Sequence, residues 1–519
     1  MTPDIGPDTR VFIVGAGIMG TGIAQVAAQA GHTVRLFDTR EGAARLARDK
    51  LAAALDGLAA KGKLDADEAK AIVARILPAA RLDEAAGAAL VVEAIVENVD
   101  AKRSLFRDLE ACVGADCVIA SNTSSISITV LGAGLKLPGR LVGMHFFNPV
   151  PVMKLVEVVS GLQTDPAVAE AIFALSKRWG KTPVHARSPP GFIVNRIARP
   201  YYAEALALLH ERAAEPAVID ACLRGAGFRM GPCELMDLIG HDTNFAVTES
   251  VFAANFGDMR YAPSLVQREM VDGGLLGRKS GRGFFAYGAA GAAPTQAAAA
   301  EAPPVPPNAI VALHGSGVAV ERWAARLDAA GVRFEADPAS RWSGLQVESA
   351  QLRLTDGRPA SQVAAEGGVR DLALFDIALP KPGAPATALA FSVAASATPQ
   401  WREQAAVWLR IAGWVPAAIG DAPGLVVART VAMLINEGAD AVHHGVCTPE
   451  GADLAMQLGV SYPLGPFGFL AAWDAAAIIA LLDHLDAHYR GERYRVSPWL
   501  RRRADADAGS GSDSGTSDA

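Results

Sequence analysis

The chain has 519 residues, of which 51% are hydrophobic and 20% charged, so about three domains are expected and global disorder is excluded. Its 48 Lys and Arg against 55 Asp and Glu give a formal charge of −7, which argues against a broad surface for nucleic acid. The apolar runs are broken by charged residues before they reach the roughly 20 residues of a membrane span. Neither a nucleic-acid partner nor a membrane partner is expected.

The start of the chain lacks the basic residues and apolar stretch of a signal peptide, and a strand-like segment follows at once. A cytoplasmic protein is therefore expected. The five cysteines are an odd number without a C-x-x-C pair, so neither a disulfide framework nor a zinc site is indicated. Ordinary buried thiols are the better interpretation, and no metal is expected.

Residues 11–38 have the pattern of a strand, a glycine turn, an Ala-rich helix and a second strand. The G-x-G-x-x-G spacing predicts a loop for a dinucleotide pyrophosphate that comprises Gly15, Gly17, Ile18, Met19 and Gly20. Asp38 ends the second strand, where it can accept from both ribose hydroxyls and repel a 2′-phosphate. The pattern predicts an NAD site, although Arg40 leaves some use of NADP open.

A long polar segment, roughly Thr39 to Gly87, separates the second strand from the next one. A simple crossover needs only one helix of about a dozen residues, so we expect an inserted helical pair. Its lysines have two interpretations of similar weight. They form a solvated charged face, or Lys61 and Lys63 contact the phosphates of a second, anionic ligand.

Strand-like runs alternate with helical stretches up to about Gly180, which predicts a parallel, doubly wound sheet. The polar run 121–125 follows one of these strands, at the carboxyl edge where such sheets bind ligands. The simpler alternative is that its hydroxyls cap the next helix.

His145 lies within an apolar strand, and Glu157 lies in the strand that follows. A histidine in such a strand is more often a satisfied core residue than a catalyst, and a single glutamate is often an edge charge. Beside a nicotinamide site, a catalytic function is expected for the two residues together. Oxidation of an alcohol by hydride loss needs a base for the hydroxyl proton, and an imidazole held by a carboxylate suits neutral pH.

After Pro190 the apolar residues follow helical spacing, and this helical region occurs twice. Residues 190–196 are echoed by residues 423–429, with Ala428 in place of Asn195. Upstream of the second copy, a faded nucleotide-binding half has Val320 where the third glycine would be, so we do not expect it to bind a dinucleotide.

These patterns predict an α/β Rossmann-type domain, an all-α domain, a degenerate α/β segment and a second all-α copy. The boundaries we expect are 1–188 for the Rossmann domain with its inserted helical pair, 189–287 for the helical substrate and dimerisation domain, 288–308 for a linker, 309–420 for the degenerate segment, 421–503 for the second helical domain and 504–519 for a disordered tail.

From Val11 to about Tyr287 the sequence closely resembles the L-3-hydroxyacyl-CoA dehydrogenase family. The resemblance rests on SNTSSISI, GMHFFNPVPVMKLVEVV, PGFIVNR, MGPCELMDLIG and GRKSGRGFF. It implies that His145 and Glu157 are the catalytic pair, and that Ser124 and Asn195 contact the region of the substrate's C3 oxygen. It also implies NAD contacts at Glu97, Lys102, Asn148 and Lys279. The family's CoA-contacting lysine falls in the helical excursion, which makes Lys61 and Lys63 its candidates.

The full length, with linker and second helical copy, is similar to the longer bacterial members, including 3-hydroxybutyryl-CoA and 3-hydroxyadipyl-CoA dehydrogenases. The resemblance implies NAD-dependent, reversible oxidation of an (S)-3-hydroxyacyl-CoA. Since the second copy has Ala428 and lacks the polar run and the His–Glu pair upstream, we expect one active site per chain. A homodimer and a monomer that uses the second copy as a pseudo-partner both stay open.

Two other functions stay open. One is an NAD-dependent dehydrogenase of a free hydroxy acid, and the other is a non-catalytic NAD-binding protein that kept the fold. The sequence contains no gauge of acyl length, so butyrate metabolism, fatty-acid β-oxidation and aromatic-acid degradation such as that of phenylacetate are all compatible with it.

Overall fold

The structure is a computed structural model that describes residues 5–288, 303–306, 309–379 and 387–512. Tertiary contacts divide the chain into two units. The first comprises Met1–Arg196 and His444–Val460, and the second comprises Ile197–His443 and Ser461–Ala519. A segment of the second helical copy therefore belongs to the first unit.

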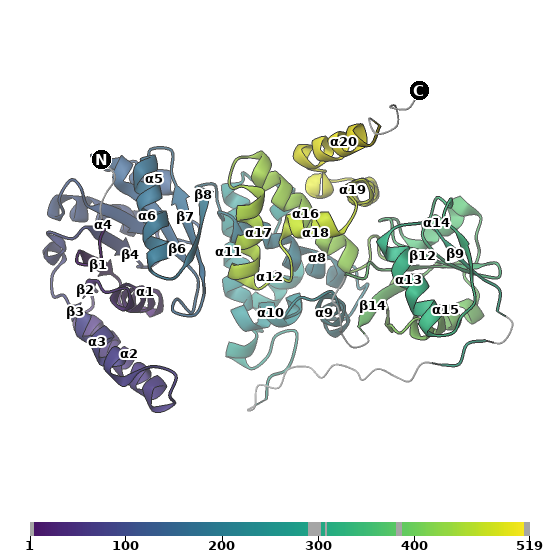
Figure 1. Ribbon diagram of the computed structural model, residues 1–519, viewed down its shortest axis with the longest axis horizontal. Coiled ribbons are helices and arrows are strands. Elements are labelled where there is room, and N and C mark those ends of the chain that lie inside the picture. Colours follow the sequence, from purple (N-terminus) through teal and green to yellow (C-terminus); the bar gives the residue numbers. More distant parts are fainter. Residues whose placement is uncertain (1–4, 289–302, 307–308, 380–386, 513–519) are drawn as a thin grey trace, which may run out of the picture. The chain divides into compact units, whose positions relative to one another are not determined.

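An eight-stranded sheet forms the centre of the first unit (Figure 1). In spatial order its strands are β3 (Ile76–Pro78), β2 (Thr33–Phe37), β1 (Arg10–Val14), β4 (Leu90–Glu93), β5 (Val118–Ser121), β6 (Leu141–Phe146), β7 (Leu155–Ser160) and β8 (Thr182–Arg187). The apolar runs of β4, β5 and β6 are buried throughout, as expected for strands covered on both faces. The strand order reverses at β1, and ligands of such sheets bind beyond the strand ends at this point.

The pairing of β6 with β7 corrects the prediction of a wholly parallel sheet. These two strands are antiparallel, whereas every other neighbouring pair of this sheet is parallel. The reason is the connection: residues 147–154 form a loop too short for the crossover that two parallel strands require. Strands β3 and β8, which the sequence did not single out, extend the sheet at its two edges.

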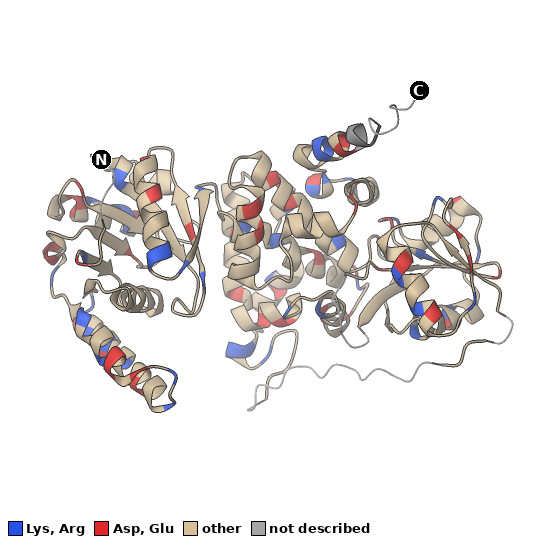
Figure 2. Cartoon of the chain, viewed as in Figure 1, with Lys and Arg blue, Asp and Glu red and all other residues tan. Residues whose placement is uncertain are grey.

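Helices flank this sheet and include the expected helical pair. They are α1 (Ile18–Gln29), α2 (Ala43–Ala60), α3 (Ala66–Arg75), α4 (Val99–Cys112), α5 (Ile128–Gly132), α6 (Pro166–Arg178) and α17 (Pro449–Val460), with the short turns η1 (Leu82–Ala85) and η2 (Pro138–Arg140). Helices α2 and α3 lie side by side and carry charges of both signs along their length (Figure 2). Asp65 caps α3 by accepting from the N–H groups of Asp67 and Glu68. The short α7 (Val194–Ile197) follows β8.

The second unit contains most of both helical copies. The first copy provides α8 (Arg199–His210), α9 (Pro216–Gly225), α10 (Pro232–Ile239), η3 (Met259–Tyr261), α11 (His241–Ala254), α12 (Leu265–Asp272) and η4 (Arg278–Ser280). The second provides α16 (Val427–His443), α18 (Pro466–Ala472), α19 (Ala475–Tyr489), η5 (Glu492–Tyr494) and α20 (Pro498–Ser512). The repeat is visible in the backbone, because Phe192 and Leu425 open the repeated helices with φ angles of 47° and 51°.

Between the helical copies along the chain, a seven-stranded sheet forms a second α/β layer. Its strands in spatial order are β10 (Glu335–Asp337), β9 (Val311–His314), β11 (Gly344–Val347), β12 (Ala350–Leu354), β13 (Leu372–Phe375), β14 (Ala388–Val393) and β15 (Val415–Ala418). Its helices are α13 (Val318–Ala329), α14 (Ala360–Gly367) and α15 (Pro399–Ile411). Its core is rich in tryptophan, with Trp323, Trp401 and Trp408 buried. This is the faded half that the sequence predicts, and it confirms the predicted fold class.

The predicted tail needs a correction, because α20 runs to Ser512, past the expected start of disorder at Ala504. Most of the predicted linker, and residues 513–519, lie outside the described residues.

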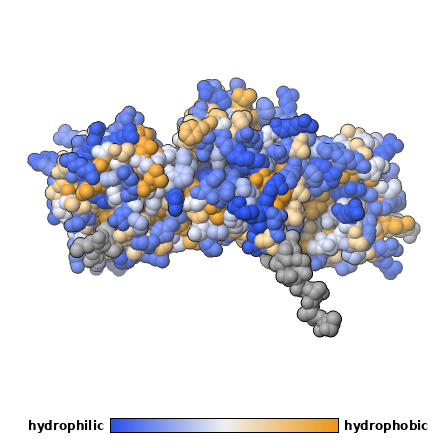
Figure 3. All heavy atoms as spheres, turned by 90° about the horizontal axis from the view of Figure 1, so that it is seen from above, coloured by the Kyte–Doolittle hydropathy of each residue, from blue (hydrophilic) through white to orange (hydrophobic). Residues whose placement is uncertain are grey.

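On the face drawn in Figure 3, apolar residues are scattered among hydrophilic ones. In the described part of the chain no single helix has the length and apolar character to cross a membrane. Helices α18 and α19 meet that test only together, across a bend of 108°.

Candidate active site

Three glycines shape the turn between β1 and α1, and their roles differ. Gly15 has a φ of 107°, and a Cβ there would lie 2.3 Å from the carbonyl oxygen of Ala94. A Cβ at Gly20 would lie 1.8 Å from the carbonyl oxygen of Gly15, whereas a Cβ at Gly17 would meet nothing within 4 Å. The turn itself therefore requires Gly15 and Gly20, and the space at Gly17 lets a pyrophosphate approach the first N–H groups of α1.

Asp38 follows β2 and faces this turn. Its Oδ2 accepts from the N–H of Ala16 at 2.8 Å, and its Oδ1 accepts from the main-chain N–H and the Nε of Arg40, both at 3.0 Å. The Arg40 side chain is the main cause that lowers the pKa of Asp38 to about 2. An ionised carboxylate beside the glycine turn fits the ribose hydroxyls of NAD and repels a 2′-phosphate.

A buried charge network links β4 to α4 and β5. Lys102 Nζ donates to Glu93 Oε1 at 2.5 Å and lies 3.3 Å from Glu97 Oε2. Ser121 Oγ donates to the other oxygen of Glu93 at 2.6 Å. Ser121 belongs to the polar run 121–125 that the sequence indicates. Glu93 was not named from the sequence, although a carboxylate that ends the apolar strand Leu-Val-Val-Glu was a visible signal.

Glu97 holds the polar run that follows β5. Its Oε1 accepts from Thr123 Oγ1 at 2.6 Å and from the N–H groups of Ser124 and Ser125 at 2.9 and 3.1 Å. Burial alone would raise the pKa of Glu97, but Lys102 and these hydrogen bonds hold it below its usual value. The run thus forms a loop fixed by a carboxylate at the carboxyl edge of the sheet.

His145 and Glu157 face each other across the antiparallel pair β6 and β7. They are register partners, and the His145 Nδ1 lies 2.5 Å from Glu157 Oε2. Both side chains are buried. Glu157 Oε1 accepts from the N–H groups of Ile193 and Val194, each at 3.0 Å. Because the carboxylate accepts at both oxygens, the Nδ1 of His145 is the donor and its Nε2 is left for another partner.

Asn195 and Ser124 are brought together although they are far apart in sequence. The Nδ2 of Asn195 donates to the carbonyl oxygen of Ser124 at 3.4 Å, and Ser124 Oγ lies 3.3 Å from Glu97 Oε1. Asn195 directly follows Val194, whose N–H is bound to Glu157. The catalytic candidates and the fixed polar loop are therefore connected within the first unit.

A cavity of about 530 Å³ lies between the glycine turn, α2 and residues 148–151. Asn148 lines it, as do Arg40 and Lys50. A Cβ at Gly22 would lie 2.8 Å from the Cβ of Val150, so the absence of a side chain on α1 lets this loop approach the cofactor helix. Asn148 is thereby placed beside the glycine turn.

Three further residues were predicted as contacts with CoA or NAD. Lys61 and Lys63 are exposed in the turn between α2 and α3, and neither lines the cavity beside the glycine turn. The lysine that lines this cavity is Lys50. Lys279 belongs to the second unit, where it forms an ion pair with Asp242. Their contacts with CoA and NAD stay predictions.

The second sheet has a carboxylate that the sequence did not reveal. Asp376 follows β13, and its two oxygens accept from the N–H groups of Val426, Val427 and Ala428 at 2.9, 2.6 and 2.8 Å. Its own N–H donates to the carbonyl oxygen of Ala390 on the antiparallel β14. Asp376 and Ala390 thus occupy the places that His145 and Glu157 occupy in the first sheet.

The comparisons with known proteins cover nearly the whole chain. Residues 10–188 match the model "3-hydroxyacyl-CoA dehydrogenase, NAD binding domain", and residues 191–287 and 424–518 each match the C-terminal domain of the same family. The chain belongs to the 3-hydroxyacyl-CoA dehydrogenase family. Residues 352–423 match a 3-hydroxybutyryl-CoA dehydrogenase reduced Rossmann-fold domain.

Several relatives of this dehydrogenase chain are similar over their full length. A 3-hydroxyadipyl-CoA dehydrogenase of Escherichia coli is 41% identical over 501 residues, which is 96% of this chain and 98% of that protein. A probable 3-hydroxybutyryl-CoA dehydrogenase of Bacillus subtilis is 43% identical over 54% of this chain and 97% of its own length. The crystal structure of a 3-hydroxybutyryl-CoA dehydrogenase from Escherichia coli matches with a TM-score of 0.86 and 40% identity, covering 97% of this chain and 99% of that one.

These matches confirm the predicted family, the oxidoreductase class and NAD as the cofactor. The glycine turn and Asp38 fit that cofactor, because the turn leaves space at Gly17 and the carboxylate is ionised beside it.

Proposed function

We propose that the chain oxidises an (S)-3-hydroxyacyl-CoA to the 3-oxoacyl-CoA, with NAD as hydride acceptor, at one active site per chain. The observation that carries the proposal is the His145–Glu157 pair, whose 2.5 Å contact lies in the unit that contains the glycine turn. Family membership supports the reaction class.

His145 is the base in this proposal. Its Nε2 takes the proton of the substrate's C3 hydroxyl while the C3 hydrogen leaves as hydride with its electron pair, so that one proton and one hydride depart and the C3–O bond becomes a carbonyl. NAD, when bound, supplies the hydride acceptor. Glu157 orients the imidazole through Nδ1 and stabilises its charged form. The reverse reaction uses the protonated His145 as the acid.

Ser124 and Asn195 position the C3 oxygen in this proposal. Asn195 Nδ2 donates to the main-chain carbonyl oxygen of Ser124 at 3.4 Å, which keeps the amide near the residue that carries the hydroxyl. An amide and a hydroxyl both bind an alcohol or a carbonyl oxygen. On the cofactor side, the glycine turn takes the pyrophosphate and Asp38 takes the ribose. Glu97, Lys102, Asn148 and Lys279 are the further NAD contacts that we carry over from the family.

CoA recognition uses positive charge on the helical pair. Lys61 and Lys63 are exposed there, and Lys50 and Arg40 line the cavity next to the glycine turn. These are suitable partners for the phosphates of CoA. The relatives' names include both 3-hydroxyadipyl-CoA and 3-hydroxybutyryl-CoA. The acyl group that this chain prefers is therefore to be identified by direct comparison of substrates.

The second half of the chain lacks the means for this reaction. Ala428 stands in place of Asn195, and Asp376 and Ala390 stand in place of the His–Glu pair. We infer that the second half supports the fold. Its helical copy packs against the first copy within the second unit, which favours a monomer with a built-in pseudo-partner over a homodimer. A cytoplasmic location stays a prediction.

The test is the loss of NADH absorbance when the purified chain meets acetoacetyl-CoA, 3-oxoadipyl-CoA or a long-chain 3-oxoacyl-CoA. Rapid NADH oxidation with at least one of them is expected, and their ranking identifies the acyl group. The matched free 3-oxo acids are the control. Turnover of the free acids alone would instead support a free hydroxy acid dehydrogenase. Tight NADH binding without turnover of any compound would overturn the proposal.

A further inference from the structure

Helix α17 of the second helical copy belongs to the first unit, which contains the catalytic pair. It packs against β7 and β8, and the main-chain N–H of Arg187 at the end of β8 donates to the carbonyl oxygen of Val446 at 2.8 Å. Strand β7 carries Glu157. A part of the chain without catalytic residues of its own is therefore in contact with the strand that carries one.

Gly459, near the end of α17, makes the closest approach. A Cβ on Gly459 would lie 2.8 Å from Leu155 Cδ2, 3.0 Å from Val194 Cγ2 and 3.6 Å from Phe147 Cε1. The first two distances are shorter than side chains normally tolerate, so these neighbours would have to move if a side chain were present.

Each of these three neighbours touches or flanks the catalytic pair. Leu155 lies two residues before Glu157 on β7, and so on the same face of the strand. Val194 donates its N–H to Glu157 Oε1 at 3.0 Å. The ring of Phe147 lies 4.5 Å from the ring of His145, measured between centroids. A displacement at Gly459 is therefore transmitted to both members of the pair.

The first helical copy makes the same kind of contact with the second sheet. Its helix α9 packs against β14, and a Cβ on Gly225 would lie 2.9 Å from the carbonyl oxygen of Ala388 and 3.3 Å from Thr387 Cβ. Gly225 and Gly459 are each followed, two residues later, by a left-handed residue, Gly227 and Ser461. The two contacts are equivalent, but β14 carries Ala390 where β7 carries Glu157.

We propose that Gly459 is a positioning residue of the active site, through which helix α17 of the second copy holds β7, Val194 and Phe147 around the His145–Glu157 pair. The second helical copy thus takes part in the reaction without contributing a catalytic group. This inference rests on the proposed function, because it assumes that His145 and Glu157 carry the chemistry.

The test compares Gly459→Ala and Gly459→Val with Gly225→Ala and Gly225→Val in the full-length chain. We expect kcat for NADH-dependent reduction of the best 3-oxoacyl-CoA to fall by about 10-fold to 100-fold in the Gly459 series, more for Val than for Ala. NADH affinity, measured by fluorescence, should stay within about 2-fold, since the residues that a Cβ at Gly459 would meet do not belong to the glycine turn. The pH profile of kcat should also change. The Gly225 series should keep the wild-type kcat and pH profile, even where it lowers the melting temperature.

A second variant guards against a simple folding defect. Leu155→Val removes the atom nearest to a Cβ at position 459, so Leu155→Val combined with Gly459→Ala should recover most of the lost kcat. Wild-type kcat in Gly459→Ala and Gly459→Val, an equal loss in the Gly225 series, or failure of Leu155→Val to rescue would each contradict the inference. Absence of turnover in the wild-type chain would instead contradict the proposed function itself.

Discussion

Residue 145 illustrates how a single side chain acquires a function from its neighbours. In an apolar strand, a histidine alone is most simply a core residue. The antiparallel register puts Glu157 opposite His145, and the N–H groups of Ile193 and Val194 hold the second carboxylate oxygen. In the second sheet Asp376 occupies the equivalent place and binds three main-chain N–H groups, so that position holds a structural carboxylate without a base.

Replacement of the base is the prediction at this scale. His145→Ala should lower kcat by about 10²-fold to 10⁴-fold, because the hydroxyl proton then has no acceptor, while NADH binding is retained. Steady-state kinetics and a fluorescence titration with NADH provide the two measurements. The control is Ala428→Asn, which restores the asparagine of the first copy but not the His–Glu pair. A second activity created by Ala428→Asn would speak against a single site per chain.

The turn between β1 and α1 shows what an element requires of its sequence. Two of its glycines are needed by the backbone itself and the third by the ligand, because a Cβ at Gly17 meets no protein atom within 4 Å whereas one at Gly20 would lie 1.8 Å from a carbonyl oxygen. The sequence pattern alone treats the three positions alike.

Matched substitutions separate these roles. Gly17→Ala should leave the melting temperature nearly unchanged and weaken NADH binding by at least about 10-fold, because the new methyl group takes the space of the pyrophosphate. Gly20→Ala should lower the melting temperature by several degrees, since a carbonyl of the turn has to move. Thermal unfolding and NADH titration of both variants measure these effects. Equal effects of the two substitutions on stability would contradict this division of roles.

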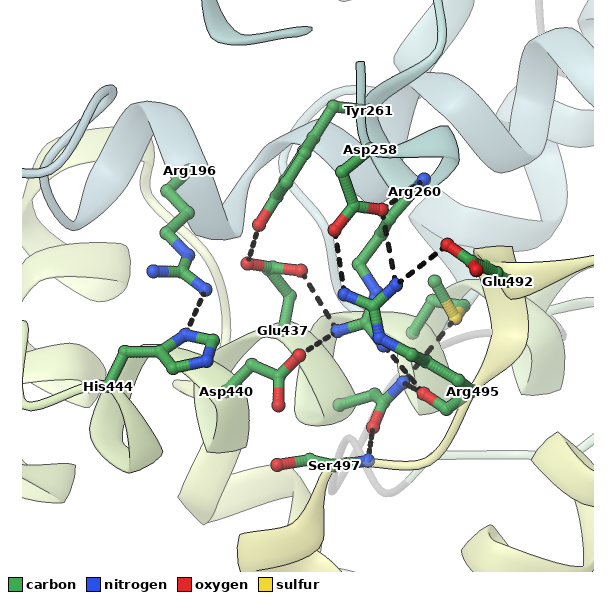
Figure 4. Close-up of polar contacts among 12 residues, drawn as sticks. Arg196, Asp258, Arg260, Tyr261, Glu437, Asp440, His444, Glu492, Arg495 and Ser497 are labelled. Atoms are coloured by element: carbon green, nitrogen blue, oxygen red, sulfur yellow. Dashed lines mark hydrogen bonds and ion pairs between the residues drawn. The ribbon is translucent and has the colours of Figure 1, made fainter. Parts of the chain in front are cut away.

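At the scale of the whole molecule, the two helical copies form a charged seam within the second unit. Glu204 of the first copy is fully buried and accepts from Arg429 Nε of the second copy at 2.9 Å and from Arg493. Burial alone would raise the pKa of Glu204, but the two arginines lower it below its usual value. Figure 4 shows a further part of the seam, where Arg260 and Tyr261 of the first copy contact Glu437 of the second.

Neutralising Glu204 tests how much this seam stabilises the chain. Glu204→Gln should lower the free energy of unfolding by about 3–5 kcal/mol at neutral pH, because it leaves buried guanidinium groups without their carboxylate. Since folding lowers the pKa of Glu204, its contribution is fully present above the unfolded value and is lost as pH falls through the folded one. The difference between wild type and variant should therefore shrink in acid. Denaturant unfolding at two pH values measures this difference.

The control for the seam is Glu211→Gln. Glu211 also faces Arg429, at 3.7 Å, but 29% of its side chain is exposed, so its substitution should cost no more than about 1 kcal/mol.

Light scattering on the wild-type chain should give the monomer mass of 53.9 kDa. A mass twice as large would contradict the built-in pseudo-partner.

The sequence by itself determined the features that depend on local order. The glycine spacing and Asp38, the alternation of strands and helices, the inserted helical pair and the repeat of residues 190–196 all lie within short segments, and they were enough to predict the fold class and NAD. The family was predicted from the resemblance of motifs such as SNTSSISI and GMHFFNPVPVMKLVEVV. Local spacing also suggested His145 and Glu157 as partners, because the two strands that carry them are adjacent in the chain.

Only the tertiary structure decided the features that depend on contacts between distant segments. In the tertiary structure β7 is antiparallel to β6, and Asn195 contacts Ser124. Asp376 occupies the position in the second sheet that His145 occupies in the first, and α17 belongs to the unit that contains the catalytic pair. Apart from the short loop between β6 and β7, these features have no local signal, because a helix's packing surface or the partner of a distant side chain is selected by the burial of apolar area across the whole fold and not by the residues next to it.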